Sequence, residues 1–123
     1  MLDIVRTPSE LPLPFSKAVR AGGFVFLSGQ IPLGADGAPL RGTIEEQTTS
    51  VIERIAASLA QQESSLQDVV RVTVWLSDLA LFARFNAVYA TYFVAPHLPV
   101  RSTVQAKLAF DVDVEIEVTA YKP

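Results

Sequence analysis

Hydrophobic residues recur at helical spacing in two segments of the chain. In the first, Thr43 and Glu46 have the spacing of a capping box, in which each side chain binds a free backbone N–H at the start of a helix. The apolar residues that then share one side are Ile44, Val51, Ile52, Ile55 and Leu59. In the second segment, Ser77 or Asp78 can cap a helix. Its broad apolar stripe consists of Leu81, Phe82, Phe85, Val88, Tyr89, Tyr92 and Phe93. Two helices with one packed face each are therefore predicted.

Other segments alternate in the pattern of β-strands. Residues 17–28 predict a hairpin that turns at Ala21-Gly22-Gly23, where glycine tolerates a positive φ. Residues 69–76 are apolar on both sides, with one side expected to carry Val70, Val72, Val74 and Leu76 and the other Val69, Arg71, Thr73 and Trp75. Residues 100–108 and 112–121 predict the last two strands, which we expect to pair with each other.

Prolines and glycines mark the segments between these elements. Pro8, Pro12 and Pro14 disfavour a helix or a central strand before about Ser16, so this segment is expected to lie over the surface. Turn-forming residues are dense across 31–42, which predicts an irregular loop.

The order ββαβαββ predicts a single α+β domain, residues 1–123, with one mixed sheet and two helices on one face. Two helices cannot cover both faces of a sheet. Half of the residues are hydrophobic and the mean hydropathy is +0.31, which is high for a monomer of 123 residues. Together with Trp75 on the uncovered face, this predicts a homo-oligomer that packs sheet against sheet.

Composition narrows the possible functions. The chain has no cysteine and one histidine, His97, so thiolate chemistry is excluded and a metal site would depend on carboxylates. The net charge is −3 with no run of Lys or Arg, which argues against nucleic-acid binding. No stretch has the length and hydrophobicity of a membrane span, and no export signal precedes the domain, so we expect a cytoplasmic protein without membrane contact.

Arg101 stands out because its charge lies in an apolar strand segment, Leu98-Pro99-Val100-Arg101-Ser102-Thr103-Val104. A guanidinium cannot deprotonate and needs an anion where it is buried. One hypothesis gives it a cross-strand partner, Glu115 or Glu117. The other gives it the carboxylate of a small ligand, which arginine can bind in bidentate fashion. Residue chemistry alone favours the structural pair.

Other polar positions also allow two interpretations. Ser28-Gly29 ends a strand, where glycine lets backbone N–H groups approach a ligand, although an ordinary exit into a loop needs the same residues. Asn86 lies in the apolar stripe of the second helix, where it is either a hydrogen-bonded core residue or a ligand contact.

Four motifs in order resemble the Rid/YjgF family of enamine and imine deaminases, which is also named after the L-PSP endoribonuclease. The motifs are Ser28-Gly29-Gln30-Ile31-Pro32, Phe85-Asn86-Ala87-Val88-Tyr89, Pro99-Val100-Arg101-Ser102 and Val114-Glu115-Ile116-Glu117. The resemblance runs from about Pro14 to Tyr121. It implies a chorismate-mutase-like fold, a homotrimer with sites in the clefts between subunits, and no cofactor.

The resemblance also implies a reaction and a set of residues. Relatives hydrolyse reactive imines such as 2-iminopropionate, which forms from 2-aminoacrylate, to a 2-oxo acid and ammonia. By motif, Arg101 would hold the substrate carboxylate and Glu115 would position or activate water, with Glu117 as the alternative. The pocket would be lined by Phe15, Ser28, Gly29, Asn86 and Thr103.

One position departs from the family pattern, since the family tyrosine near the N-terminus aligns with Phe15, which lacks the hydroxyl. Carboxylate binding and water activation do not need that hydroxyl. The alternatives to a deaminase are a non-catalytic sensor of 2-oxo acids and an endoribonuclease. The net charge of −3 and the lone His97 argue against the endoribonuclease.

Overall fold

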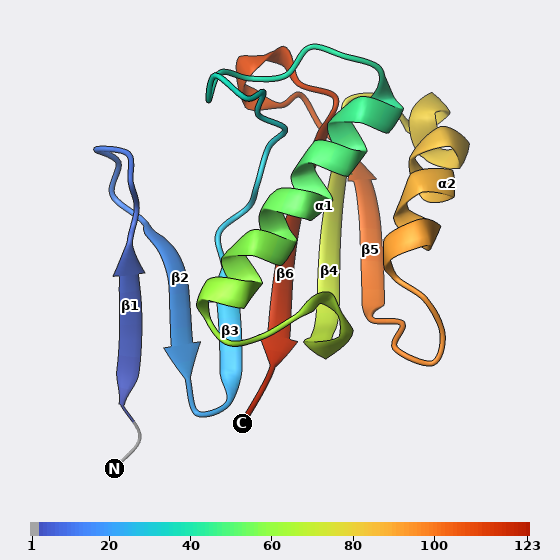
Figure 1. Cartoon of the computed structure of the whole chain (residues 1–123). Helices are drawn as coiled ribbons and strands as arrows, with labels where there is room; N and C mark the ends of the chain where they lie inside the picture. The colour runs from blue at the N-terminus through green and yellow to red at the C-terminus, as the bar shows by residue number, and fades with distance from the viewer. Residues whose placement is uncertain (1–2) are drawn as a thin grey trace.

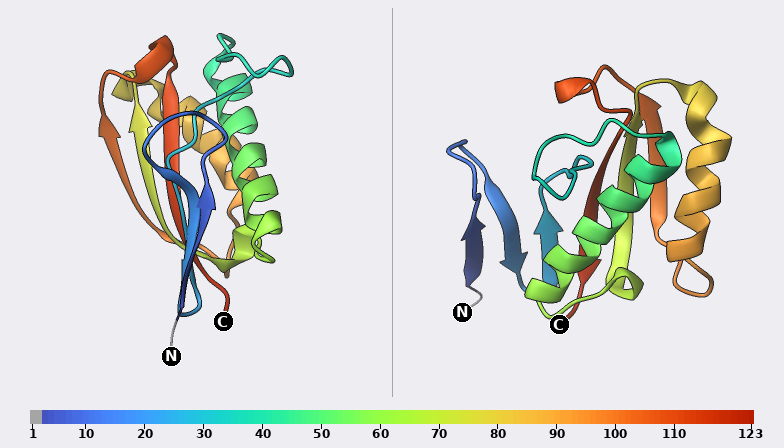
Figure 2. Two further views of the ribbon diagram at one scale, coloured as in Figure 1. Left: turned by 90° about the vertical axis from the view of Figure 1, so that its left-hand side faces the viewer. Right: turned by 45° about the horizontal axis from the view of Figure 1, so that its top comes forward.

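The computed structural model describes residues 3–123, and its strands form one six-stranded sheet with both helices on one face (Figures 1 and 2). The strands are β1 (Ile4–Pro8), β2 (Ser16–Ala21), β3 (Phe24–Leu27), β4 (Val69–Leu76), β5 (Val100–Gln105) and β6 (Val114–Tyr121). The helices are α1 (Ile44–Gln61) and α2 (Phe82–Tyr92), with 3₁₀ turns at Leu66–Asp68, Leu79–Leu81 and Ala109–Asp111. The predicted mixed sheet and its two helices are confirmed.

The order of the strands is β1-β2-β3-β6-β4-β5, and only β4 and β5 run parallel. The expected pairing of residues 100–108 with 112–121 is therefore wrong, because β4 lies between β5 and β6. A parallel neighbour needs a crossover connection, which α2 supplies between β4 and β5. This topology decides which side chains can meet Arg101.

The first strand was not predicted. β1 pairs antiparallel with β2 at the edge of the sheet, and it ends at Pro8, where the register shifts. Proline is compatible with an edge strand because its missing N–H costs no hydrogen bond on the open side. The proline-rich opening thus excludes a central strand, as expected, but not an edge strand.

A second departure lies at the start of β4. The register shifts between Val69 and Arg71, which leaves Val69 buried and Val70 exposed. A bulge inserts one residue and moves the following side chains to the other face. The predicted grouping is wrong at Val70, which does not share the buried face of Val72, Val74 and Leu76, and at Val69, which is buried in the core instead of lying with Arg71, Thr73 and Trp75.

The core lies between the helices and one face of the sheet. The predicted stripe of α1 is buried, as are the alternate residues of β6 (Val114, Ile116, Val118 and Ala120). Phe85, Tyr89 and Phe93 bring α2 into the same core. No helix within residues 3–123 is long and apolar enough to cross a membrane.

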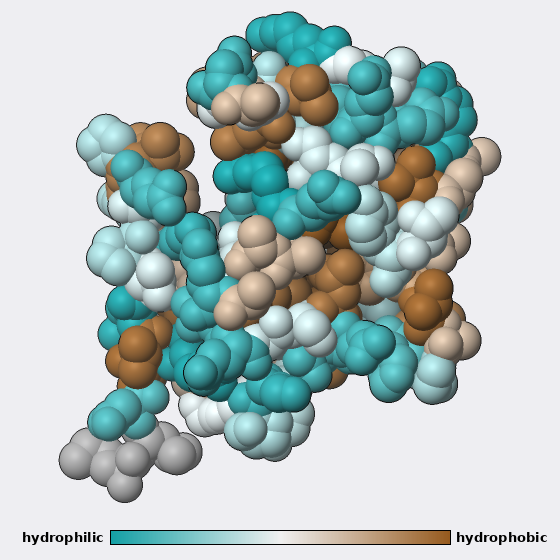
Figure 3. All heavy atoms as spheres, in the orientation of Figure 1, coloured by the Kyte–Doolittle hydropathy of each residue, from teal (hydrophilic) through white to brown (hydrophobic). Residues whose placement is uncertain are grey.

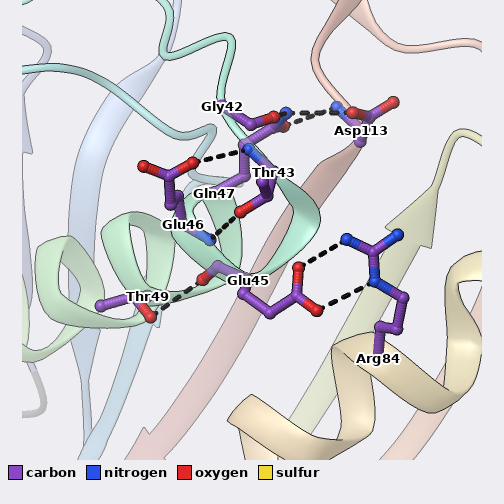
Figure 4. Close-up of polar contacts among 8 residues, drawn as sticks. All are labelled: Gly42, Thr43, Glu45, Glu46, Gln47, Thr49, Arg84 and Asp113. Atoms are coloured by element: carbon purple, nitrogen blue, oxygen red, sulfur yellow. Dashed lines mark hydrogen bonds and ion pairs between the residues drawn. The ribbon is translucent and has the colours of Figure 1, made fainter.

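Polar contacts fix the start of α1 (Figure 4). The capping box is present, since Thr43 N donates to Glu46 Oε1 at 2.9 Å and Glu46 N donates to Thr43 Oγ1 at 3.1 Å. Gln47 is buried and joins this end of α1 to the start of β6 through Asp113. Glu45 binds Arg84 with two hydrogen bonds of 2.7 and 2.9 Å, which connects α1 to α2.

The opposite face of the sheet carries no helix (Figure 2). Phe24, Phe26 and Tyr121 are each more than two-fifths exposed there and contact one another, with ring centroids 6.1 and 4.9 Å apart. The prediction that residues 69–76 are covered on both faces is not met within one chain, since Trp75 is only half-buried.

Candidate functional site

The predicted site residues fall into two groups in different parts of the chain. Four of them line a pocket of about 960 Å³: Phe15, Ser28, Gly29 and Glu115. The pocket lies between the 9–15 segment, the 31–39 loop, the later turns of α1 and residues Ala109 and Phe110. Figure 3 shows part of it as the notch between the segment at upper left and the body of the molecule. We call these four residues the Glu115 group.

Backbone pairing holds Gly29 against Glu115. Gln30 N donates to Ile116 O at 2.8 Å, and Ile116 N donates to Gln30 O at 3.0 Å. This bridge brings the strand exit beside β6, so that a Cβ added to Gly29 would collide with Oε2 of Glu115. The glycine at position 29 therefore leaves room for the Glu115 carboxylate, which is a second reason for a glycine at this strand exit.

The Ser28 hydroxyl is a hydrogen-bond acceptor towards the pocket. Its Oγ donates to the carbonyl oxygen of Ser16 at 2.6 Å, which uses its only proton. The lone pairs of Oγ stay available. The Ser28 hydroxyl can therefore accept a hydrogen bond from an N–H group of a ligand.

The environment of Glu115 favours its protonated form. Burial raises the pKa of the Glu115 carboxyl, and the negative charge of Glu117 raises it further. No cation among residues 3–123 lies within 4.0 Å of Glu115 to offset this. A carboxyl with a raised pKa can exchange a proton with a reacting group nearer to neutral pH than an ordinary glutamate.

Glu117 is exposed on the same face, two residues further along β6, and does not line the pocket. Phe15 lies at the pocket wall with its ring 47% exposed. The resemblance did not point to Leu11, Leu13 and Phe110, whose side chains make the pocket largely apolar around Phe15. No pattern in the sequence marks these three residues, because only the fold shows which apolar side chains lie beside Phe15.

The remaining predicted residues, Arg101, Thr103 and Asn86, lie at the β5 edge of the sheet. We call these three the Arg101 group. Arg101 is in register with the buried Val72 of β4, so its side chain points to the helix side. Glu115 and Glu117 are in register with Trp75 and Thr73, on the opposite face.

The cross-strand ion pair is therefore wrong. Glu115 and Glu117 are separated from Arg101 by β4 and point away from it, and no carboxylate among residues 3–123 lies within 4.0 Å of its guanidinium. Three aromatic rings of α2 surround the charge instead. The Arg101 Cζ atom is 4.7 Å from the ring centroid of Tyr89, 5.5 Å from that of Phe85 and 5.6 Å from that of Phe82. Cation–π attraction stabilises the guanidinium here without neutralising it.

Two polar atoms beside Arg101 are buried without a hydrogen-bond partner. One is Oγ1 of Thr103, which lies two residues along β5 and hence on the same face. The other is the hydroxyl of Tyr89. Asn86 is half-buried on α2, four residues after Phe82 and three before Tyr89, which places it on the same side of the helix.

Tyr89 is a core residue, as its place in the apolar stripe predicts. Its contact with Arg101 was missed because it depends on the parallel pairing of β4 with β5 beneath α2. No local pattern in the sequence encodes that pairing.

The chain is similar to known proteins over nearly its whole length. Residues 8–122 match the family model described as Endoribonuclease L-PSP. A RutC family protein of Pyrococcus abyssi is 46% identical over 111 residues, which cover 89% of this chain and 87% of that protein.

Two solved structures share the fold. A Thermotoga maritima protein described as a candidate endoribonuclease has a TM-score of 0.86 and 42% identity, covering 96% of this chain and 93% of its own. A Yersinia pestis protein described as a Rid family member of unknown function has a TM-score of 0.86 and 35% identity, covering 94% and 93%. The family model matches nearly the whole chain. Solved structures of similar proteins are described as members of the YjgF or Rid family, which is the family that the four sequence motifs resemble. The chain belongs to the Rid/YjgF family, whose sequence model bears the description Endoribonuclease L-PSP.

Proposed function

We propose that the protein hydrolyses 2-imino acids and their enamine tautomers, such as 2-iminopropionate and 2-aminoacrylate, to 2-oxo acids and ammonia. The observation that carries this proposal is the unpaired charge of Arg101, which lies against aromatic rings and has no carboxylate within 4.0 Å among residues 3–123. A half-buried guanidinium in this state is a receptor for a small carboxylate.

The two groups of residues supply complementary parts of such a site. Arg101 binds the carboxylate, with the Thr103 hydroxyl and Asn86 beside it. Glu115 takes a proton from water as the oxygen attacks the imine carbon, and Ser28 accepts a hydrogen bond from the imine N–H. Glu115 returns this proton to the nitrogen, which completes the carbinolamine. It then takes the hydroxyl proton as the C=O bond forms and passes it to the nitrogen, so that the C–N bond breaks with release of ammonia. Imines hydrolyse in water unaided, so positioning and proton transfer worth about 10²–10⁴-fold are sufficient.

The two groups point to opposite faces of one sheet, so we propose that each site joins the Glu115 group of one copy to the Arg101 group of the next. A closed ring of copies brings two different surfaces together at every interface, as in a trimer. The exposed rings of Phe24, Phe26 and Tyr121 on the open sheet face support a homotrimer, because a monomer gains nothing by exposing them. We propose a cytoplasmic location, which cell fractionation tests.

Arg101→Ala is the direct test of the proposed reaction. A serine dehydratase generates 2-aminoacrylate in the assay, and the protein's acceleration of pyruvate and ammonia formation is measured. We expect Arg101→Ala to lose about 30-fold or more of kcat/KM, since it removes the charged partner of a buried carboxylate. Arg41→Ala, at an exposed arginine in the loop before α1, is the matched control and should be unchanged.

Other outcomes separate the alternatives. Binding of 2-oxobutyrate without any acceleration of imine hydrolysis would contradict the deaminase and indicate a metabolite sensor. Cleavage of RNA by the wild type but not by Arg101→Ala would favour the activity in the name of the Thermotoga relative. The net charge of −3 argues against that result.

A further inference from the structure

Tyr89 carries a buried hydroxyl that lies close to the Arg101 guanidinium but makes no hydrogen bond within residues 3–123. The Tyr89 ring lies nearest to the guanidinium, at 4.7 Å, and is itself stacked on Phe93 with ring centroids 4.4 Å apart. The side chain is 7% exposed, and its hydroxyl has no hydrogen-bond partner. A buried hydroxyl without a partner destabilises a fold, so a phenylalanine would be the better core residue at this position.

The hydroxyl remains protonated at physiological pH. Burial raises the pKa of Tyr89, and the positive charge of Arg101 lowers it only in part. The group can therefore donate as well as accept a hydrogen bond. A second unpaired hydroxyl, that of Thr103, lies on the same side of β5 as Arg101.

The aromatic rings leave the guanidinium able to bind an anion. Phe85 is fully buried behind Arg101, whereas Phe82 is 42% exposed and Arg101 only half-buried, so one side of the charge is open. Because aromatic faces offer no carboxylate, Arg101 forms no ion pair with any residue that the structure describes, and its charge and N–H donors stay available to an anion.

We propose that Tyr89 is a positioning residue for the carboxylate receptor: its ring holds the Arg101 guanidinium, and its hydroxyl gains its missing partner when a small carboxylate is bound. The unpaired hydroxyl then lowers the stability of the ligand-free protein and strengthens its binding of the carboxylate. The nature of the ligand rests on the proposed function, whereas the coupling of Tyr89 to Arg101 does not depend on turnover.

Two variants of Tyr89 and one matched control test this role. Tyr89→Phe keeps the ring and removes the hydroxyl, Tyr89→Leu removes both, and Phe93→Leu removes a buried ring of the same stack that does not contact Arg101. The affinity for 2-oxobutyrate is measured by calorimetry, and the melting temperature is measured in the absence of ligand.

Tyr89→Phe should move the two readouts in opposite directions. We expect its melting temperature to rise by a few degrees, because an unpaired buried hydroxyl is removed, while its affinity falls by about 3- to 10-fold with one lost hydrogen bond. Tyr89→Leu should lose about 10-fold or more, because the nearest ring is gone. Phe93→Leu should lose melting temperature to a similar degree as Tyr89→Leu and keep its affinity within about twofold.

If Tyr89 only stabilises the fold, its substitutions should change the melting temperature but should lower the affinity for 2-oxobutyrate no more than Phe93→Leu does. Unchanged affinity in Tyr89→Phe, or equal losses of affinity in Tyr89→Leu and Phe93→Leu, would overturn the proposal even if the wild type is a deaminase. If the wild type binds 2-oxobutyrate but hydrolyses no imine, the proposed function fails, and the same three variants still decide the role of Tyr89.

Discussion

The surroundings of Glu115 destabilise its negative charge, whereas the surroundings of Arg101 stabilise its positive charge. Glu115 is held by close backbone packing against Gly29, and its surroundings oppose its charge. Arg101 is held by aromatic rings that favour its charge without cancelling it. Within residues 3–123, no cation lies within 4.0 Å of Glu115 and no carboxylate lies within 4.0 Å of the Arg101 guanidinium. The comparison teaches that, in the proposed shared site, neither half would neutralise the other before substrate binds.

Among the substitutions that test this difference between the two groups, Gly29→Ala should cause the largest loss of activity. The added Cβ would collide with Glu115 Oε2, so the carboxylate must leave its position or the strand exit must shift. A displacement of about 1 Å can cost on the order of 100-fold in rate, and we expect such a loss in kcat for imine hydrolysis. Affinity for 2-oxobutyrate should fall much less, because the Arg101 group is untouched.

Gly22→Ala, in the turn between β2 and β3, is the control for Gly29→Ala, since no atom lies within 4 Å of an added Cβ there and Gly22 does not line the pocket, although its positive φ adds strain. It should keep its kcat. If Gly29→Ala also keeps its kcat, the Glu115 carboxylate does not act from the position described.

The second prediction concerns pH. The pKa of Glu115 is raised above its ordinary range, and a water-activating carboxylate must be ionised, so kcat/KM should fall as the pH drops through this raised pKa. Glu117→Gln removes the second cause of the shift and should move the acidic limb of the profile to lower pH. An acidic limb that does not move would mean that Glu117 does not act on the titrating group.

The same shift affects stability. A raised pKa in the folded state favours folding most at low pH, and this contribution is lost as the pH rises through the raised value. Glu115→Gln should therefore raise the melting temperature at pH 7 relative to the wild type and change it little at about pH 3, below the ordinary pKa range of glutamate. Scanning calorimetry at the two pH values checks this sign.

The smallest effect is expected for Phe15→Tyr. The ring is 47% exposed at the pocket wall, so the added hydroxyl meets no steric barrier. If it can reach the reacting groups, one new hydrogen bond should raise kcat/KM by about 2- to 10-fold, with little change in melting temperature. A loss of activity would show that the apolar wall formed with Leu13 and Phe110 is needed as it stands.

Much of the fold follows from local patterns in the sequence. The capping box at Thr43, the buried stripe of α1, the hairpin at Gly22 and the alternation of β6 are all present as predicted. Each of these depends on residues within a few positions of one another. Composition also indicated an apolar face without a helix, which Phe24 and Phe26 provide.

The features that the sequence did not predict are long-range. The place of β4 between β6 and β5, the edge pairing of β1 and the bulge before Arg71 are properties of strand neighbours rather than of any one segment. Phe15, Ser28, Gly29 and Glu115, which the family resemblance pointed to, line one pocket, while their roles there stay a prediction. The cross-strand pairing of Arg101 with Glu115 or Glu117, which residue chemistry alone favoured, is wrong because it depended on the order of the strands.

The central claim, that each site is shared between two copies, is tested most directly by mixing two inactive variants. Arg101→Ala and Glu115→Gln chains with different tags are co-expressed, the mixed oligomers are purified, and imine hydrolysis is measured. In a ring of three that combines the Glu115 group of one copy with the Arg101 group of the next, every purified mixed ring has one intact site out of three. We therefore predict about a third of wild-type activity, whereas activity no higher than the mean of the two single variants would contradict the shared site.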